Sequence, residues 1–136
     1  MTCKSTATAN TYLAAIENLF SLKAPAMARA DVLLKSEYEQ TPKGQIVAWR
    51  AFLRILAMFQ HRNLDFLDSN DSLHDLADMA LCQAPWHSMP LLVVAQVEYL
   101  YNQNLTTSLH FAERSIEANK SNPLAWAVKS LSLIHI

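Results

Sequence analysis

A single glycine, Gly44, stands among the 136 residues of this chain, and this scarcity restricts the fold more than any other feature of the sequence. Phosphate-binding loops and dinucleotide-binding turns need several glycines for tight turns and close backbone approach. The nucleophile elbow of serine hydrolases needs two glycines around its serine. Many β-hairpins also depend on glycine-rich turns, so a β-rich fold is disfavoured. Helices are the remaining way to organise the chain.

The length and the balanced charge of the chain predict one helical domain without a strongly charged surface. The chain is 51% hydrophobic and carries 11 Lys and Arg against 12 Asp and Glu, a formal net charge of −1. A chain of this length can bury a core without disulfides or metals. Domains that grip nucleic-acid backbones are usually basic, so direct nucleic-acid binding is not expected. The two cysteines, Cys3 and Cys82, are too few for a disulfide framework and fit a reducing cytoplasm.

The apolar segments are too interrupted to predict a membrane span or an export signal. The stretch from Val47 to Phe59 is broken by Arg50 and Arg54, whereas a spanning helix needs roughly 18 or more apolar residues. Near the N-terminus, Glu17 interrupts the apolar run that a signal peptide would need, so an amphipathic helix is the preferred interpretation. We expect a cytoplasmic protein with no membrane segment.

Apolar residues recur at helical spacing through most of the sequence. Prolines, capping residues and polar turns separate these segments and predict where each helix begins and ends. The third and fifth segments are apolar on nearly all sides, which predicts helices packed on more than one face. The predicted helices are Asn10 to Leu22, Ala26 to Gln40, Gln45 to His61, Ser72 to Gln83, Ser88 to Tyr101, Thr106 to Lys120 and Asn122 to the end of the chain.

The second half of the chain carries an internal register. The span from Met89 to Asn122 is 34 residues, the period of a tetratricopeptide unit. On that register, Tyr99 takes the aromatic position eleven of this unit and Trp126 the aromatic position four of the next. The stretch from Leu76 to Pro85 looks like the second helix of an earlier unit. The chain therefore resembles the tetratricopeptide (TPR) repeat family, although Gln96 replaces the small residue at position eight.

The resemblance implies an all-α fold, a right-handed superhelical array of antiparallel helix hairpins with about seven helices in one domain over residues 1–136. Successive hairpins stack so that each covers the apolar face of its neighbour, which agrees with the two nearly all-apolar helices. The last helix is still apolar where the chain stops, so we expect a fragment of a longer protein. The polar connection from Arg62 to Asp71 is an insertion relative to the repeat.

In such repeats the first helix of each unit lines a concave surface. Trp49 and Leu56 mark the earlier unit, whose register places Arg50, Arg54 and Met58 on that surface. Two arginines four residues apart can hold a carboxylate or phosphate with planar guanidinium groups, so an acidic peptide is the expected guest. The alternative is that both arginines lie on the solvent side of a packed helix or pair with nearby carboxylates.

The later unit places Val93, Val97 and Tyr101 on the same surface. With the two arginines and Met58 they complete the predicted partner-binding set. These apolar side chains form either a peptide groove or a face covered by other helices or by a second subunit, and coverage is the preferred interpretation.

Neither a metal site nor an active site is predicted. His74, Asp78 and Cys82 follow one ridge of a helix, but only adjacent members of such a ridge reach a common ion. The five histidines are scattered, without a pattern typical of acid–base or nucleophilic catalysis. No cofactor is expected. Trp86, in a predicted turn, is the tryptophan most suited to a surface role.

We therefore expect a non-catalytic module that binds a protein or peptide on its concave face. By analogy with bacterial proteins of this family, its host is a transcription regulator, of which it forms the regulatory part. Two alternatives stay open. One is a self-association domain, in which the apolar edge from Leu131 to Ile136 joins two copies as a homodimer. The other is a small-molecule sensor with a pocket under the connection from Arg62 to Asp71.

Overall fold

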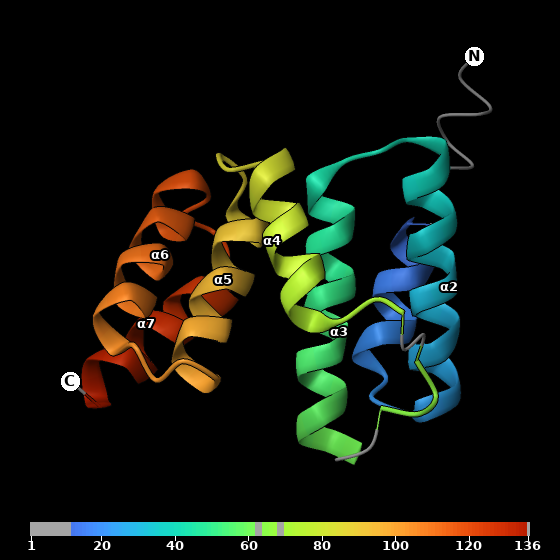
Figure 1. Cartoon of the computed structure of the whole chain (residues 1–136), viewed down its shortest axis with the longest axis horizontal. Coiled ribbons are helices and arrows are strands. Elements are labelled where there is room, and N and C mark those ends of the chain that lie inside the picture. The colour runs from blue at the N-terminus through green and yellow to red at the C-terminus, as the bar shows by residue number, and fades with distance from the viewer. Residues whose placement is uncertain (1–11, 62–63, 68–69, 136) are drawn as a thin grey trace.

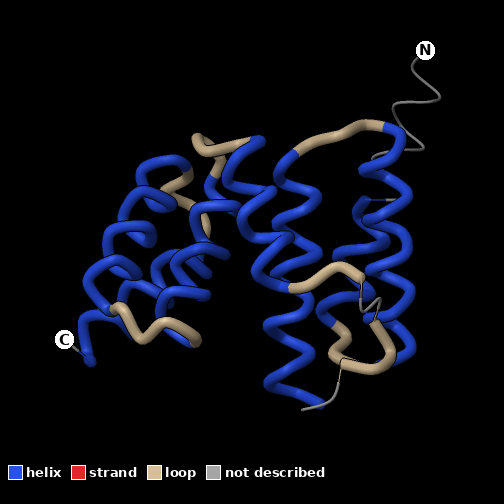
Figure 2. Tube along the Cα trace, in the orientation of Figure 1, coloured by secondary structure: helices blue, strands red, loops and turns tan. Residues whose placement is uncertain are grey.

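The computed structural model describes residues 12–61, 64–67 and 70–135, and this part of the chain consists of helices and connecting loops (Figure 2). The all-α class with seven helices is confirmed for the described residues, whereas the predicted start at Asn10 lies outside them. After a first helix over residues 12–20 come α2 (Ala24–Gln40), α3 (Gly44–His61), α4 (Leu73–Gln83), α5 (Ser88–Leu100), α6 (Leu105–Ala118) and α7 (Pro123–His135) (Figure 1).

Two predicted helix starts are confirmed by their capping bonds. Ser72 Oγ accepts a hydrogen bond of 3.2 Å from the backbone N–H of Asp75 at the start of α4. At the start of α7, Asn122 Oδ1 accepts a bond of 3.1 Å from the backbone N–H of Leu124. Pro123 is the first helical residue there, where its missing N–H leaves no helical bond unmade.

α5 begins at Ser88 as predicted, whereas the cap of α6 differs from the predicted one. His87 Nδ1 accepts the backbone N–H of Met89 at 3.1 Å and so caps α5. Asn104 Oδ1 accepts the backbone N–H of Thr107 at 3.1 Å and caps α6. The predicted start of α6 at Thr106 is therefore slightly late. Asparagine is at least as strong a capping residue as threonine, and here it precedes the threonine pair.

Helices that follow one another in the sequence pack side by side, and α3 and α5 lie at the centre of the molecule (Figure 1). α3 contacts α2, α4 and α5, and α5 contacts α3, α4, α6 and α7. The prediction that these two helices pack on more than one face is confirmed, and it explains their apolar composition. Their buried side chains include Val47, Ala51, Phe52, Leu53 and Ile55 of α3 and Leu91, Leu92, Val93 and Ala95 of α5.

Small polar residues let α5 and α6 approach closely. Ser108 and Ser115 of α6 are fully buried. Ser108 Oγ donates to the carbonyl oxygen of Ala95 (2.7 Å), and Ser115 Oγ donates to that of Ser88 (2.8 Å). Asn122 Nδ2 donates to Ser88 Oγ at 3.0 Å and fixes the start of α7 on the same hairpin. Because the hydroxyl groups of Ser88, Ser108 and Ser115 all have hydrogen-bond partners, their burial has little desolvation cost.

The chain's one glycine lies where α3 begins against the end of α4. A Cβ atom on Gly44 would lie 2.7 Å from Ala84 Cβ and 2.9 Å from the carbonyl oxygen of Ala80, both shorter than normal contacts. The φ angle of Gly44 is not positive. The glycine is therefore needed for space between two helices and not for a left-handed turn.

No helix within the described residues combines the length and the apolarity needed to cross a bilayer.

Candidate interaction groove

Arg50 and Arg54 do not face solvent but are 5% and 3% exposed, respectively. Arg50 Nε and Arg54 Nη1 each donate to Asp31 Oδ1 of α2 at 2.8 Å. Both guanidinium groups are therefore not available to an acidic peptide. The structure agrees with the alternative, in which they pair with a nearby carboxylate. The physical reason is that this side of α3 packs against α2, where Asp31 is the buried counter-charge.

Asp71 extends this pair into a buried charge cluster of Asp31, Arg50, Arg54 and Asp71. Arg50 Nη2 donates to Asp71 Oδ2 at 2.9 Å, and Arg54 Nε donates to the backbone oxygen of Asp71 at 2.7 Å. Lys35 of α2 approaches the same carboxylate at 3.7 Å. The cluster thus joins α2 and α3 to the segment that enters α4.

The electrostatics of the cluster favour the charged forms. Burial alone would raise the pKa of Asp31, but hydrogen bonds and attraction from Arg50 and Arg54 outweigh it and hold this pKa below its usual value. Burial likewise works to lower the pKa of Arg50, but the bonds and attraction from Asp31 and Asp71 raise it. Asp31 and Arg50 are therefore both held in their charged forms, and they bond to each other within the protein.

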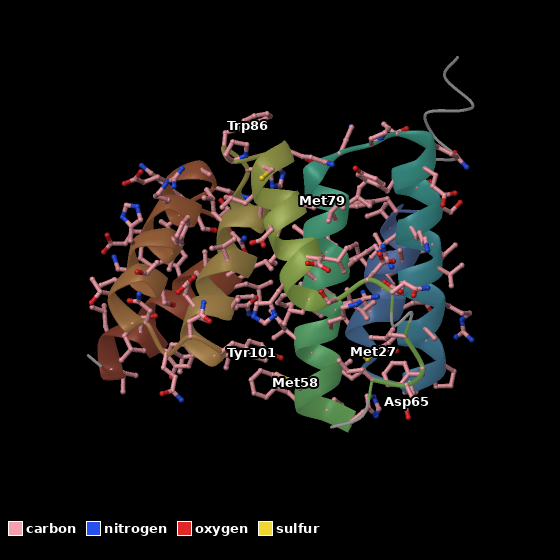
Figure 3. The ribbon with its side chains drawn as sticks, viewed as in Figure 1. Met27, Met58, Asp65, Met79, Trp86 and Tyr101 are labelled. Atoms are coloured by element: carbon pink, nitrogen blue, oxygen red, sulfur yellow. The ribbon has the colours of Figure 1, made fainter. Side chains whose placement is uncertain are left out.

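The four other predicted binding residues occupy two different places. Val93 and Val97 are buried in the core, which agrees with the preferred interpretation that they are covered. Met58 and Tyr101 lie near one another at the ends of α3 and α5, where the tyrosine hydroxyl contacts the methionine sulfur at 2.7 Å (Figure 3). The His74 ring of α4 packs edge-on against Tyr101. The predicted set therefore does not form one binding surface.

A different surface is hollowed, between the first helix and the last hairpin. This interaction groove has a volume of about 580 Å³. The first helix and α3 form one wall, and the start of α5 with the turn between α6 and α7 forms the other. Its lining residues are Tyr12, Phe20, Trp49, His87, Ser88, Met89, Asn119, Ser121, Asn122, Pro123 and Leu124.

The first wall of the groove is aromatic. The ring of Trp49 packs edge-on against Phe20 (6.0 Å between centroids) and against Phe52 (5.6 Å), which anchors it to the core. Burial raises the pKa of Tyr12 to about 12, although a hydrogen bond with Trp49 works in the opposite direction. The Tyr12 phenol is therefore neutral at physiological pH.

The second wall is polar but uncharged. Because His87 Nδ1 accepts the cap bond from Met89, its proton lies on Nε2 in the neutral imidazole. Burial lowers the pKa of His87, which keeps the ring neutral at physiological pH. None of the described residues that line the groove is Asp, Glu, Lys or Arg. The groove therefore suits an apolar guest with hydrogen-bonding groups at its edge.

We expect acid to destabilise the protein partly through His87. Protonation of Nδ1 removes the acceptor that caps α5. Because the folded-state pKa lies below the ordinary value of 6.5, the unfolded chain takes up the proton first, and stability falls as the pH drops below about 6.5. His87→Asn keeps a capping group that does not titrate. Between about pH 7.5 and 5.5, the melting temperature of the wild type should fall about 3 °C more than that of the variant. Equal falls would contradict the capping role.

The predicted pocket under the connection to α4 is present in part. Arg54, Leu64, Asp65, Leu67, Asp71, Ser72 and Leu73 line a hollow of about 480 Å³. Residues 62, 63, 68 and 69 of the connection lie outside the described residues. The guanidinium of Arg54 and the carboxylate of Asp71 already belong to the buried charge cluster. Among the described residues, no group of three or more His, Cys, Asp or Glu is placed to hold a metal ion.

Sequence reasoning missed the groove because its walls come from distant parts of the chain. Trp49, which in the sequence only marks the earlier unit, packs against the core and is also part of a groove wall. The one local signal on the other wall was the Asn122 and Pro123 cap, which marks the start of α7 but not what it faces. Comparison with protein-family models, with curated proteins and with solved structures finds no match.

Proposed function

We propose that this chain is a non-catalytic interaction module, a TPR-like array of helix hairpins that binds an uncharged, apolar peptide segment of a partner protein in the interaction groove. The observation that carries the proposal is the groove itself, with an aromatic wall, a polar wall and no Asp, Glu, Lys or Arg among the lining residues that the structure describes. Burial of an apolar side chain of the guest in such a lining is favourable, whereas a charged side chain of the guest would be buried without a partner.

The order of helix contacts supports the array. α5 packs against both helices of the preceding hairpin, α3 and α4, and against its own partner α6, and α7 then packs against α5 and α6. Stacked hairpins produce this order because each new first helix covers the pair before it. On this proposal, the groove lies between the first helix and the beginning of the fourth unit.

The chemistry of the groove changes the expected partner. An acidic peptide was expected from exposed arginines, but Arg50 and Arg54 are bonded to Asp31. The groove instead offers Phe20 and Trp49 to an apolar side chain, and the exposed Asn119 to a peptide backbone. An extended segment with one or two large apolar anchors and no charge fits this arrangement.

Filling the groove with charge tests the proposal. Ser121 lies exposed in the turn between α6 and α7, so Ser121→Arg should leave folding within about 0.5 kcal/mol while placing a long cation at the groove. Peptides enriched from a displayed random library on the wild-type chain should bind the variant at least about tenfold more weakly, since binding an apolar guest would desolvate the added charge. Fluorescence anisotropy of labelled peptides gives the affinities.

Thr106→Arg is the matched control, because it adds the same side chain at an exposed position at the start of α6, outside the groove lining. It should bind the selected peptides like the wild type. A library that yields no binder, or binders equally weakened by both substitutions, would remove the groove from the function.

A further inference from the structure

Charge is distributed unevenly along this nearly neutral chain. Between Arg62 and Arg114 there is no Lys or Arg, while the same stretch contains Asp65, Asp68, Asp71, Asp75, Asp78, Glu98 and Glu113. α4 lies within this stretch and has two aspartates and His74 but no Lys or Arg. A surface built from α4 therefore carries a negative potential that the overall net charge of −1 conceals.

One face of α4 is turned away from the protein. Asp75, Asp78, Met79 and Cys82 follow the i, i+3, i+4, i+7 spacing of a single helix face, and all four are exposed. The opposite face, with Leu76, Ala77 and Ala80, is buried against the core. The outward face is therefore mainly polar, but it also presents one large apolar side chain, that of Met79.

Trp86 lies exposed in the turn that follows α4. Its side chain is 73% exposed and that of Met79 is 41% exposed. Figure 3 shows Trp86 projecting from the upper edge of the molecule, beside the end of the helix that carries Met79. An exposed tryptophan is unusual, and it is the residue type most enriched among side chains that dominate binding energy. Methionine adapts its shape to a partner.

We propose that this α4 face, defined as Asp75, Asp78, Met79, Cys82 and Trp86, docks a basic amphipathic segment of a partner protein. Apolar side chains of the segment pack on Met79 and Trp86, and its Lys or Arg side chains meet Asp75 and Asp78. A guanidinium placed over the exposed indole gains a cation–π contact as well. The negative potential repels nucleic-acid phosphates, which leaves a basic protein segment as the complementary occupant.

The residues around Trp86 predict the orientation in which the partner segment binds. A hollow of about 510 Å³ adjoins the indole, and Lys43 is the basic side chain among the residues that line it. Cations of the partner are therefore expected on the Asp75 and Asp78 side of the indole, with its uncharged end near Lys43. The α4 face shares no residue with the interaction groove, so a negative result at one surface does not contradict the proposal for the other.

The test uses the whole chain and a designed probe. The probe is a fluorescent amphipathic peptide of about 15 residues with leucines on one side and arginines on the other. Its twin replaces each arginine with glutamate. At low salt the arginine peptide should bind and the glutamate twin should not. Asp75→Asn with Asp78→Asn should weaken binding about 5- to 10-fold, and Trp86→Ala at least about 5-fold.

Matched variants separate the α4 face from general charge effects. Glu17→Gln with Glu117→Gln makes the same change in net charge at exposed positions of the first helix and α6, and should cost less than about twofold. Trp126→Ala removes an exposed tryptophan of α7 and should leave binding unchanged. Thermal unfolding confirms that each variant is folded, as expected for exposed side chains.

Three results would overturn the proposal. The glutamate twin could bind as well as the arginine peptide, which would remove the charge argument. The control pair could weaken binding as much as the aspartate pair, which would remove the location. Light scattering could show self-association that Trp86→Ala abolishes while the peptide fails to bind, which would assign the α4 face to a second copy of the chain.

Discussion

Asp31→Ala should lower the free energy of unfolding by about 3–5 kcal/mol. The change leaves Arg50 and Arg54 buried and without their shared acceptor, since Asp31 receives hydrogen bonds from both. Urea denaturation followed by circular dichroism measures the loss. Asp78→Ala, which removes an exposed carboxylate, is the matched control and should stay within about 0.5 kcal/mol.

A triple variant separates the cost of an unpaired charge from the value of the cluster. Asp31→Leu with Arg50→Met and Arg54→Met replaces the buried ions with apolar side chains of similar length, and its stability should lie within about 2 kcal/mol of the wild type. If Asp31→Ala alone costs less than about 1 kcal/mol, both guanidinium groups must find water when Asp31 is removed, and the cluster is not closed to solvent.

The same cluster contributes to acid unfolding in a defined range. Because the pKa of Asp31 is held below its ordinary value of 3.8, the stability from its ionised form is complete above about pH 4. It is lost as the pH falls through the lowered pKa. The triple variant lacks this contribution and should show a flatter loss of stability below pH 4, separate from the effect of His87 at higher pH.

Gly44→Ala should lower the free energy of unfolding by about 2 kcal/mol, although alanine is the better helix former. The added methyl group would lie 2.7 Å from Ala84 Cβ and 2.9 Å from the backbone oxygen of Ala80, so α3 and α4 must move apart. Tightly packed cores resist such movement. Thermal and urea unfolding measure the change.

The double variant identifies the contact responsible. Ala84→Gly removes the atom closest to the new methyl group, so the double variant should be more stable, by about 1 kcal/mol, than the sum of the single effects predicts. The rescue stays partial because the Ala80 oxygen remains. A Gly44→Ala protein as stable as the wild type would show that the helices can separate there without cost.

Much of the candidate site depends on distances that the sequence does not contain. The spacing of Arg50 and Arg54 places both on one side of α3, but not toward α2, where Asp31 lies 19 residues earlier in the chain. The interaction groove joins Tyr12 to Leu124, which no local pattern connects. By contrast, the residues on the outward face of α4 can be predicted from helical spacing once Leu76 and Ala80 are known to be buried.

What the sequence determined by itself was local. One glycine, helical apolar spacing and the Ser72 and Asn122 caps were enough for an all-helical chain with two central helices, since these depend on neighbours within a turn or two. Only the tertiary structure decided which faces meet. Helix packing brings Asp31 to the arginines, Ala84 to Gly44 and Trp49 to the last hairpin. The physical reason is that burial and charge pairing depend on separation in space, whereas the sequence records only separation along the chain.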